Sequence, residues 1–152
     1  MWRYTFDPVS HQLLGADVGE GNEEEIDIVT KGKNFGWPIK EGNGKGDLSD
    51  SNNTSIFTSP ICTYSHKTGI CVIGGSFYYG EGIPSLKNKY VFADFNGSLH
   101  SLVKNDAGTW IRQPIKLILL RLILGTLPAG LHSIATMIRR FPMFKKIGRA
   151  HV

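Results

Sequence analysis

The sequence contains few of the features that would assign it to a common class of enzyme or membrane protein. It has only two cysteines in 152 residues, and it contains no nucleophile elbow, zinc-ligand cluster or dinucleotide-binding fingerprint. The longest uncharged run, residues 122–138, has 17 residues and is broken by two glycines and a proline. Because a membrane-spanning helix needs about 20 mostly apolar residues, the sequence predicts no membrane span.

Acidic residues are absent from the last quarter of the chain. Residues 1–114 contain 10 of the 17 basic residues and all 13 acidic ones, so their net charge is −3, whereas residues 115–152 carry +7. The apparent basicity therefore belongs to the tail alone. The main part of the chain shows no basic surface pattern, and we expect no nucleic-acid partner.

The tail differs in character from the rest of the chain. Residues 115–124 read IKLILLRLIL, and the last six residues read IGRAHV, which matches one reading frame of a common sequencing adapter. We therefore expect residues 114–152 to lie outside the fold and to derive from frameshifted or adapter sequence. The rival hypothesis, a basic amphipathic membrane helix, is disfavoured by the glycines and the proline, so we expect no membrane partner.

Up to residue 113 the sequence is typical of an all-β protein. Short apolar segments separated by turn residues predict strands, and no stretch shows a convincing helical period. The predicted strands are 2–6, 13–17, 26–29, 61–64, 71–79, 90–94, 99–103 and 110–112. Gly74 and Gly75 predict a bulge, Gly97 a hairpin turn, and residues 42–58 a long surface loop. This pattern favours a sandwich, a barrel or a propeller. The start, MWRYTF, is a strand pattern without the apolar core of a signal peptide.

The most specific stretch is residues 14–40, LGADVGEGNEEEIDIVTKGKNFGWPIK. Together with later motifs in the same order, it resembles the glucose/sorbosone dehydrogenase family, which includes soluble quinoprotein sugar dehydrogenases and hedgehog-interacting-protein-like proteins. The motifs that carry the resemblance are DVG at 17–19, EEID at 24–27, GKNFGWP at 32–38, YSH at 64–66, GG at 74–75, FYYG at 77–80, IPSL at 83–86 and YVFADF at 90–95.

The resemblance implies a six-bladed β-propeller, of which residues 1–113 would form about two blades. The partners of this fragment would then be the missing blades of the parent chain and a small sugar substrate. Catalytic members of the family oxidise an aldose with pyrroloquinoline quinone (PQQ) and calcium. The turn at Gly19–Glu20 matches the one whose backbone carbonyls bind that calcium, and Glu24 matches an acidic position that suggests a second, structural calcium. His66 falls near the mouth of the cofactor site.

The resemblance also has gaps. The Arg-Asn pair and the catalytic histidine of the enzymes would lie upstream of Met1, so we expect no catalytic residue in this chain and no turnover from it alone. Phe95 falls where the enzymes use a lysine against the cofactor's carboxylates, and Glu20 falls where many relatives have glutamine. The rival to the dehydrogenase hypothesis is therefore a non-catalytic, secreted binding module of the hedgehog-interacting-protein-like type. A third hypothesis, a membrane-associated protein, depends wholly on the tail.

Each candidate site residue also has a plainer interpretation. Glu24 either ligates a metal or belongs to a solvated strand entrance, and Asp17 either lies near a ligand or orients its turn by an Asx hydrogen bond. His66 is either a cofactor contact or a surface histidine. The side chains of residues 77–79 predict core packing rather than a cofactor platform.

The two cysteines, Cys62 and Cys71, flank an eight-residue loop at the ends of neighbouring predicted strands. A disulfide closing a loop of that size would stabilise the fold by roughly 2–3 kcal/mol. We predict this bridge because the resembling family is largely periplasmic or secreted. The alternative is a pair of buried thiols.

Overall fold

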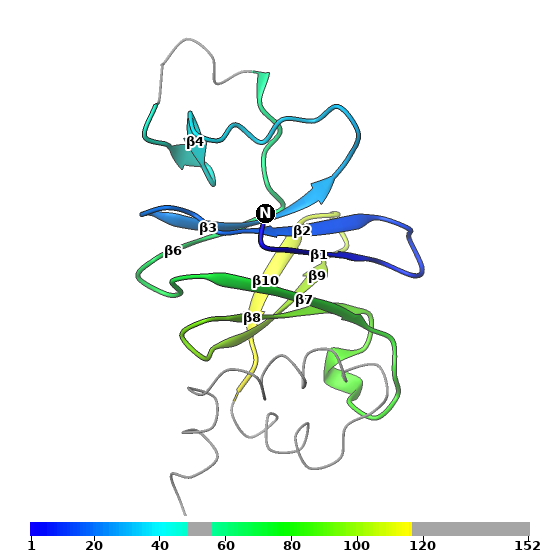
Figure 1. Ribbon diagram of the computed structural model, residues 1–152. Helices are drawn as coiled ribbons and strands as arrows, with labels where there is room; N and C mark the ends of the chain where they lie inside the picture. Colours follow the sequence, from blue (N-terminus) through cyan, green and yellow to red (C-terminus); the bar gives the residue numbers. More distant parts are fainter. Residues whose placement is uncertain (49–55, 117–152) are drawn as a thin grey trace, which may run out of the picture. The chain divides into compact units, whose positions relative to one another are not determined.

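The structure is a computed structural model, and it describes residues 1–48 and 56–116 (Figure 1). It divides into two compact units, Met1–Gly74 and Gly75–Val152, and each unit contains one four-stranded antiparallel sheet. The predicted tail, 114–152, lies outside the described residues except for 114–116. Within the described part of the chain, no helix is long and apolar enough to cross a membrane.

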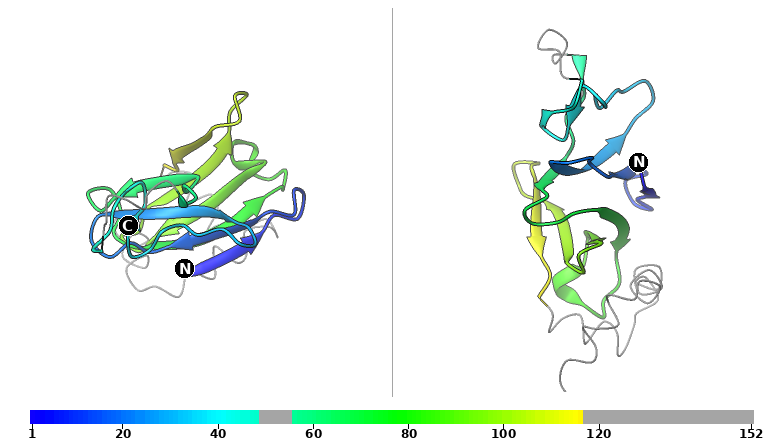
Figure 2. Two further views of the ribbon diagram at one scale, coloured as in Figure 1. Left: turned by 90° about the horizontal axis from the view of Figure 1, so that it is seen from above. Right: turned by 60° about the vertical axis from the view of Figure 1, so that its left-hand side comes forward.

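The sheet of the first unit has four strands in chain order. They are β1 (Arg3–Phe6), β2 (Leu13–Asp17), β3 (Glu23–Val29) and β6 (Cys62–Ser65), and the first three lie side by side in Figure 2. Strands β2 and β3 pair so that Ala16 faces Ile26 and Leu14 faces Ile28. Because side chains alternate along a strand, these apolar residues share one face, and Leu14, Ala16 and Ile26 are fully buried there.

A small hairpin interrupts the loop predicted for residues 42–58. Strands β4 (Lys40–Glu41) and β5 (Gly44–Lys45) pair with each other across a turn at Gly42 and Asn43. The loop prediction was wrong at this point because two-residue strands are too short to produce an alternating pattern. The middle of the predicted loop, 49–55, lies outside the described residues.

The sheet in the second unit also follows chain order. Its strands are β7 (Val72–Tyr78), which begins at the end of the first unit, β8 (Lys89–Asp94), β9 (Leu99–Lys104) and β10 (Trp110–Pro114). A short 3-10 helix, η2 (Pro84–Leu86), connects β7 to β8. The predicted hairpin turn between β8 and β9 is confirmed, with Gly97 at φ 95° and its amide donating to the Asp94 carbonyl.

Aromatic side chains build the core of this second sheet. Tyr78, Tyr90 and Phe92 are fully buried, and the Phe77 ring lies 5.2 Å from the Tyr90 ring. The core role predicted for residues 77–79 is confirmed for Phe77 and Tyr78. Gly75 permits a close approach between strands, because a Cβ at that position would collide with the backbone of Val91.

Both sheets are thus four-stranded antiparallel meanders whose strands follow one another in chain order. That is the architecture of a propeller blade. The eight strands predicted from the sequence all correspond to strands of these two sheets, within three residues at each end.

Candidate functional site

A polar cavity of about 330 Å³ lies in the first unit, beside the turn between β2 and β3. It is lined by Met1, Asp17, Val18, Gly19, Glu23, Glu25, Trp37, Lys40, Glu41 and Gly42. Four of these residues carry carboxylates, and the cationic groups among them are the Lys40 side chain and the Met1 amino group. Gly19, predicted to lie at a calcium site, is part of this lining.

Glu41 on β4 fixes the shape of the turn that contains Gly19. Its Oε1 accepts hydrogen bonds from the amides of Gly21 (3.0 Å), Asn22 (2.6 Å) and Glu23 (3.0 Å), and its Oε2 accepts one from Asn22 Nδ2 (3.0 Å). Burial alone would raise the pKa of this carboxyl, but the hydrogen bonds outweigh burial and lower its pKa to about 2. Glu41 is therefore ionised at neutral pH and holds the turn as an anion.

The backbone at Gly19 has no room for a side chain. A Cβ there would collide with the Glu23 carbonyl and with Oε1 of Glu41. The turn therefore requires glycine at this position because its two ends approach so closely.

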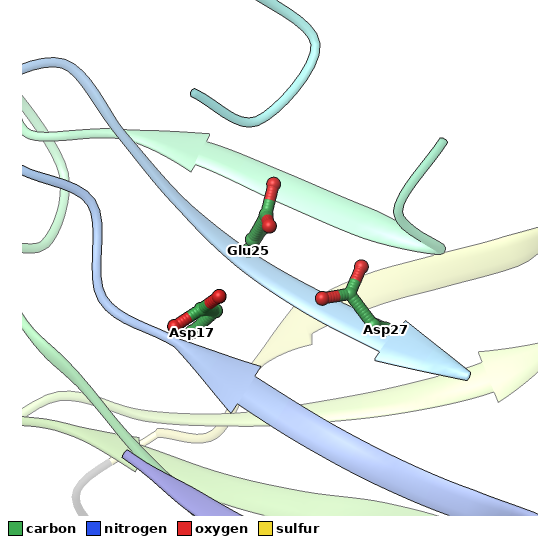
Figure 3. A group of neighbouring side chains, drawn as sticks. All are labelled: Asp17, Glu25 and Asp27. Atoms are coloured by element: carbon green, nitrogen blue, oxygen red, sulfur yellow. The ribbon is translucent and has the colours of Figure 1, made fainter. Parts of the chain in front are cut away.

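Three carboxylates gather next to this turn and are called here the acidic triad: Asp17, Glu25 and Asp27. One ligand oxygen from each lies within 4.8 Å of the others, and Figure 3 shows Asp17 at the end of β2, with Glu25 and Asp27 on the same side of β3. Register explains the grouping. Asp17 pairs directly with Glu25, and Asp27, two residues further along β3, pairs with Gly15.

The two triad residues on β3 are buried and poor in partners, whereas Asp17 is half-buried. Asp27 is fully buried and Glu25 is 8% exposed. Neither oxygen of Asp27, nor Oε2 of Glu25, has a hydrogen-bond partner among the described residues. Glu25 accepts a hydrogen bond from the Gly42 amide, and Asp17 forms an ion pair with the Met1 amino group.

This burial changes the acidity of both β3 carboxyls. Desolvation raises the pKa of Glu25 to about 7, and the charge of Asp17 adds to that effect. Desolvation likewise raises the pKa of Asp27 to about 8, with the charge of Glu25 adding to it. A buried, unpaired carboxylate is costly unless a proton or a cation neutralises it.

The donor set suits calcium better than it suits a quinone cofactor. Hard cations prefer carboxylate and carbonyl oxygens, and the triad together with the Gly19 turn offers these donors. PQQ carries several carboxylates, and a cavity lined by Asp17, Glu23, Glu25 and Glu41 repels such an anion. The residues described here therefore fit calcium and do not, by themselves, fit PQQ.

The structure brings Glu24 and His66 together, but away from the cavity. Oε1 of Glu24 lies 2.6 Å from His66 Nε2, and its Oε2 accepts a hydrogen bond from the Val72 amide at 2.6 Å. Glu24 is fully buried. Its side chain lies on the same face of β3 as that of Ile26 and on the opposite face from that of Glu25. The predicted metal ligand Glu24 and the predicted cofactor contact His66 thus bind each other in this structure.

The remaining predicted residues take other positions. Glu20 is exposed, and the charge of Asp47 together with a hydrogen bond to it raises the pKa of the Glu20 carboxyl. Phe95 is 40% exposed. The structure forms no disulfide between Cys62 and Cys71, so the predicted bridge is absent from it. Cys62 Sγ instead lies 3.9 Å from the Thr63 carbonyl oxygen.

The sequence predicted Asp17 at a turn, favoured Glu24 over its neighbours Glu23 and Glu25 as a metal ligand, and gave no prediction for Asp27. Within a run of three glutamates, no local signal shows which one faces the cavity. Glu25 and Asp27 are two residues apart on one strand, so their side chains lie on the same face. Predicting that Asp17 joins them would also have required the register between β2 and β3.

Comparison with known proteins places this site in a family. The sequence model described as Glucose / Sorbosone dehydrogenase matches residues 3–117. The chain belongs to the glucose/sorbosone dehydrogenase family. Within this family, the chain is 33% identical over 110 residues to the HIPL1 protein of Arabidopsis thaliana, and 36% identical over 109 residues to the HIPL2 protein of the same plant.

This member of the glucose/sorbosone dehydrogenase family spans about one sixth of the length of the two HIPL proteins. The matches cover 64% and 61% of this chain but only 16% of HIPL1 and 15% of HIPL2. Among solved structures, the PQQ-bound form of the aldose sugar dehydrogenase from Streptomyces coelicolor is similar, with 24% identity and a TM-score of 0.52. That match covers 74% of this chain and 29% of the other. The likeness shows a shared β-propeller fold, and a share near one third agrees with two blades of six.

Proposed function

We propose that this chain is a segment of a quinoprotein-type aldose dehydrogenase, a secreted or periplasmic oxidoreductase that uses PQQ and calcium. The single observation that supports the proposal is the family match over residues 3–117, which includes the Gly19 turn and its acidic cavity. When bound, PQQ would supply the hydride acceptor for the sugar. The contribution of this chain would be to hold calcium and to form part of the rim of the cofactor site.

The described residues supply calcium donors at the cavity, and no histidine is among the residues that line it. Of the three histidines in the described part of the chain, His66 is bonded to Glu24, His100 is buried in the second sheet, and His11 follows the turn after β1. Lys40 and the Met1 amino group are the cations of the cavity lining. A histidine base and the partners of the PQQ carboxylates would therefore have to come from other blades.

The test is a dye-linked aldose oxidation assay on two proteins, each reconstituted with PQQ and calcium. We expect the 152-residue chain to show no turnover above the rate without enzyme. We expect the complete parent protein to reduce the dye with an aldose. Turnover by the 152-residue chain alone would contradict the proposed division of roles, and a parent protein that neither binds PQQ nor oxidises sugars would contradict the dehydrogenase assignment.

A second candidate function is a non-catalytic binding module of the hedgehog-interacting-protein-like type. It is favoured by the higher identity to the HIPL proteins, 33% and 36%, than to the aldose sugar dehydrogenase of S. coelicolor, 24%. The acidic cavity, which repels a polyanionic quinone, agrees with it. A PQQ titration of the parent protein separates the two candidates, because the module binds calcium without PQQ.

A further inference from the structure

The hairpin turn between β8 and β9 carries a sequence motif that the proposed function does not use. Residues 96–98 read Asn-Gly-Ser, which matches the acceptor pattern for N-linked glycosylation, Asn-x-Ser/Thr with x other than proline. Two further matches begin at Asn52 and Asn53, overlap each other and lie outside the described residues. We propose that Asn96 is an N-glycosylation site and that the folded turn between β8 and β9 presents its glycan to solvent.

The motif lies at the tip of a tight hairpin. The Gly97 amide donates to the Asp94 carbonyl at 3.0 Å, and the Asp94 amide donates to the Ser98 carbonyl at 3.0 Å. Gly97 has a φ of 95°, a conformation that favours glycine. Asn96 is exposed, whereas Asp94 is fully buried. A bulky, hydrophilic group on Asn96 therefore projects from the surface of the sheet and displaces no core side chain.

The hydrogen bonds of Asn96 are compatible with the modification. Its Oδ1 accepts a hydrogen bond from the Ser98 amide at 2.8 Å, and its own amide donates to Oδ1 of Asp94 at 2.9 Å. In the transfer, Nδ2 displaces a lipid-linked pyrophosphate from the anomeric carbon of the first sugar. The N–C bond forms, the C–O bond breaks, and one proton passes from Nδ2 to a base of the transferase. Oδ1 remains an acceptor, so the turn keeps both hydrogen bonds after modification.

The hydroxyl of Ser98 has one role in the acceptor motif and another in the folded hairpin. The acceptor pattern requires a hydroxyl two residues after the asparagine. In the structure, Oγ of Ser98 lies 2.9 Å from Nε2 of His100, and His100 is only 7% exposed. Because the folded hairpin engages this hydroxyl, we expect the transfer to occur before β8 and β9 pair.

The neighbour of Asn96 connects this site to the choice between the two candidate functions. Phe95 is 40% exposed and falls where the resembling enzymes use a lysine against the carboxylates of the cofactor. A glycan on the next residue would crowd that position, so it agrees better with the binding module than with the dehydrogenase. The inference rests on one part of the proposed function, secretion of the parent protein, because Asn-x-Ser/Thr acceptors are modified in secreted proteins.

The test is site-specific mass spectrometry of the 152-residue chain, secreted from eukaryotic cells with an added, cleavable signal peptide. A peptide-N-glycosidase removes the glycan and converts the modified asparagine to aspartate, which marks the site. We expect a glycan on Asn96 in most secreted molecules. Asn96→Gln and Ser98→Ala should each abolish it, because the first removes the acceptor nitrogen and the second removes the required hydroxyl. Ser98→Thr keeps a hydroxyl and should keep the glycan.

The matched control is Asn105, an exposed residue in the turn between β9 and β10 whose Oδ1 accepts a hydrogen bond from the Thr109 amide at 2.8 Å. Residues 105–107 read Asn-Asp-Ala and lack the hydroxyl, so Asn105 should carry no glycan. Asn105→Gln should leave the glycan on Asn96 unchanged. Thermal melts before and after glycosidase treatment test the folded turn, and we expect the glycosylated chain to melt at the same temperature or higher.

Two results would overturn the proposal. Secreted molecules without a glycan on Asn96, from cells that glycosylate a reporter protein, would show that the motif is not an acceptor. A chain that melts at a lower temperature with the glycan than without it would show that the turn does not tolerate the modification. The added signal peptide delivers the chain to the secretory pathway whether or not the parent protein is secreted. Neither measurement involves PQQ or sugar oxidation, so failure of this proposal and failure of the proposed function are distinguishable.

Discussion

At the scale of single residues, the cavity contains carboxylates in opposite electrostatic situations. Glu41 is surrounded by donors, whereas Asp27 has none among the described residues. Their pKa values accordingly move in opposite directions, to about 2 and to about 8. Glu41 needs no cation to remain charged, and its role is to position the turn. Asp27 remains charged at neutral pH only if a cation compensates it.

The hydrogen bonds to Glu41 predict a specific dependence of stability on pH. Because the folded-state pKa of Glu41 lies below its ordinary value of 4.5, its stabilisation is fully present above pH 4.5 and is lost as the pH falls toward 2. At about 1.4 kcal/mol per pKa unit, the shift sets an upper bound of about 3 kcal/mol on this effect, which solvent screening reduces. Glu41→Gln should therefore unfold in less urea than the unmodified chain at pH 6, and the difference should shrink between pH 4.5 and 2.5. A difference that stays constant across this range would contradict the charged capping role.

At the scale of strands, the sequence predicted where the elements lie but not how their faces meet. Alternation of apolar and polar residues located the strands of both sheets, because burial of one face imposes that period. The triad depends instead on pairing Asp17 with Glu25, and a shift of one residue would have sent Glu25 to the core and Glu24 to the cavity. Local pattern cannot distinguish these two registers within a run of three glutamates.

The contact between Glu24 and His66 likewise lay beyond sequence reasoning, because it joins residues 42 positions apart. Glu24 connects β3 to the residue that follows β6 and to the first amide of β7. These contacts account for the burial of Glu24 without a metal.

Glu24→Gln tests which glutamate serves a cation. The change removes the negative charge beside His66 but keeps an oxygen that can accept the hydrogen bond from the Val72 amide. We expect a loss of about 1–3 kcal/mol in the free energy of unfolding, as for a charged hydrogen bond, without loss of the fold. Calcium affinity measured by calorimetry should match that of the unmodified chain. A tenfold loss of calcium affinity would instead restore Glu24 as a ligand.

At the scale of the whole molecule, the chain spans about one sixth of the length of the HIPL relatives it matches. The first strand of its first sheet carries a row of exposed aromatic side chains. Trp2, Tyr4 and Phe6 alternate along β1 and its preceding residue, and they are 61%, 68% and 65% exposed. Strand β1 is also an edge of its sheet. Soluble monomers rarely expose such a contiguous apolar row, and an unprotected edge strand favours pairing with another chain.

We therefore expect the 152-residue chain by itself to associate with copies of itself as its concentration rises. Replacing the row together, as Trp2→Ser, Tyr4→Thr and Phe6→Thr, should shift the chain toward the monomer in sedimentation velocity. The control is Val9→Ser, which removes a similarly exposed apolar side chain that lies outside the row, and it should leave association unchanged. A chain that stays monomeric at high concentration, with the row intact, would show that these aromatics need no cover.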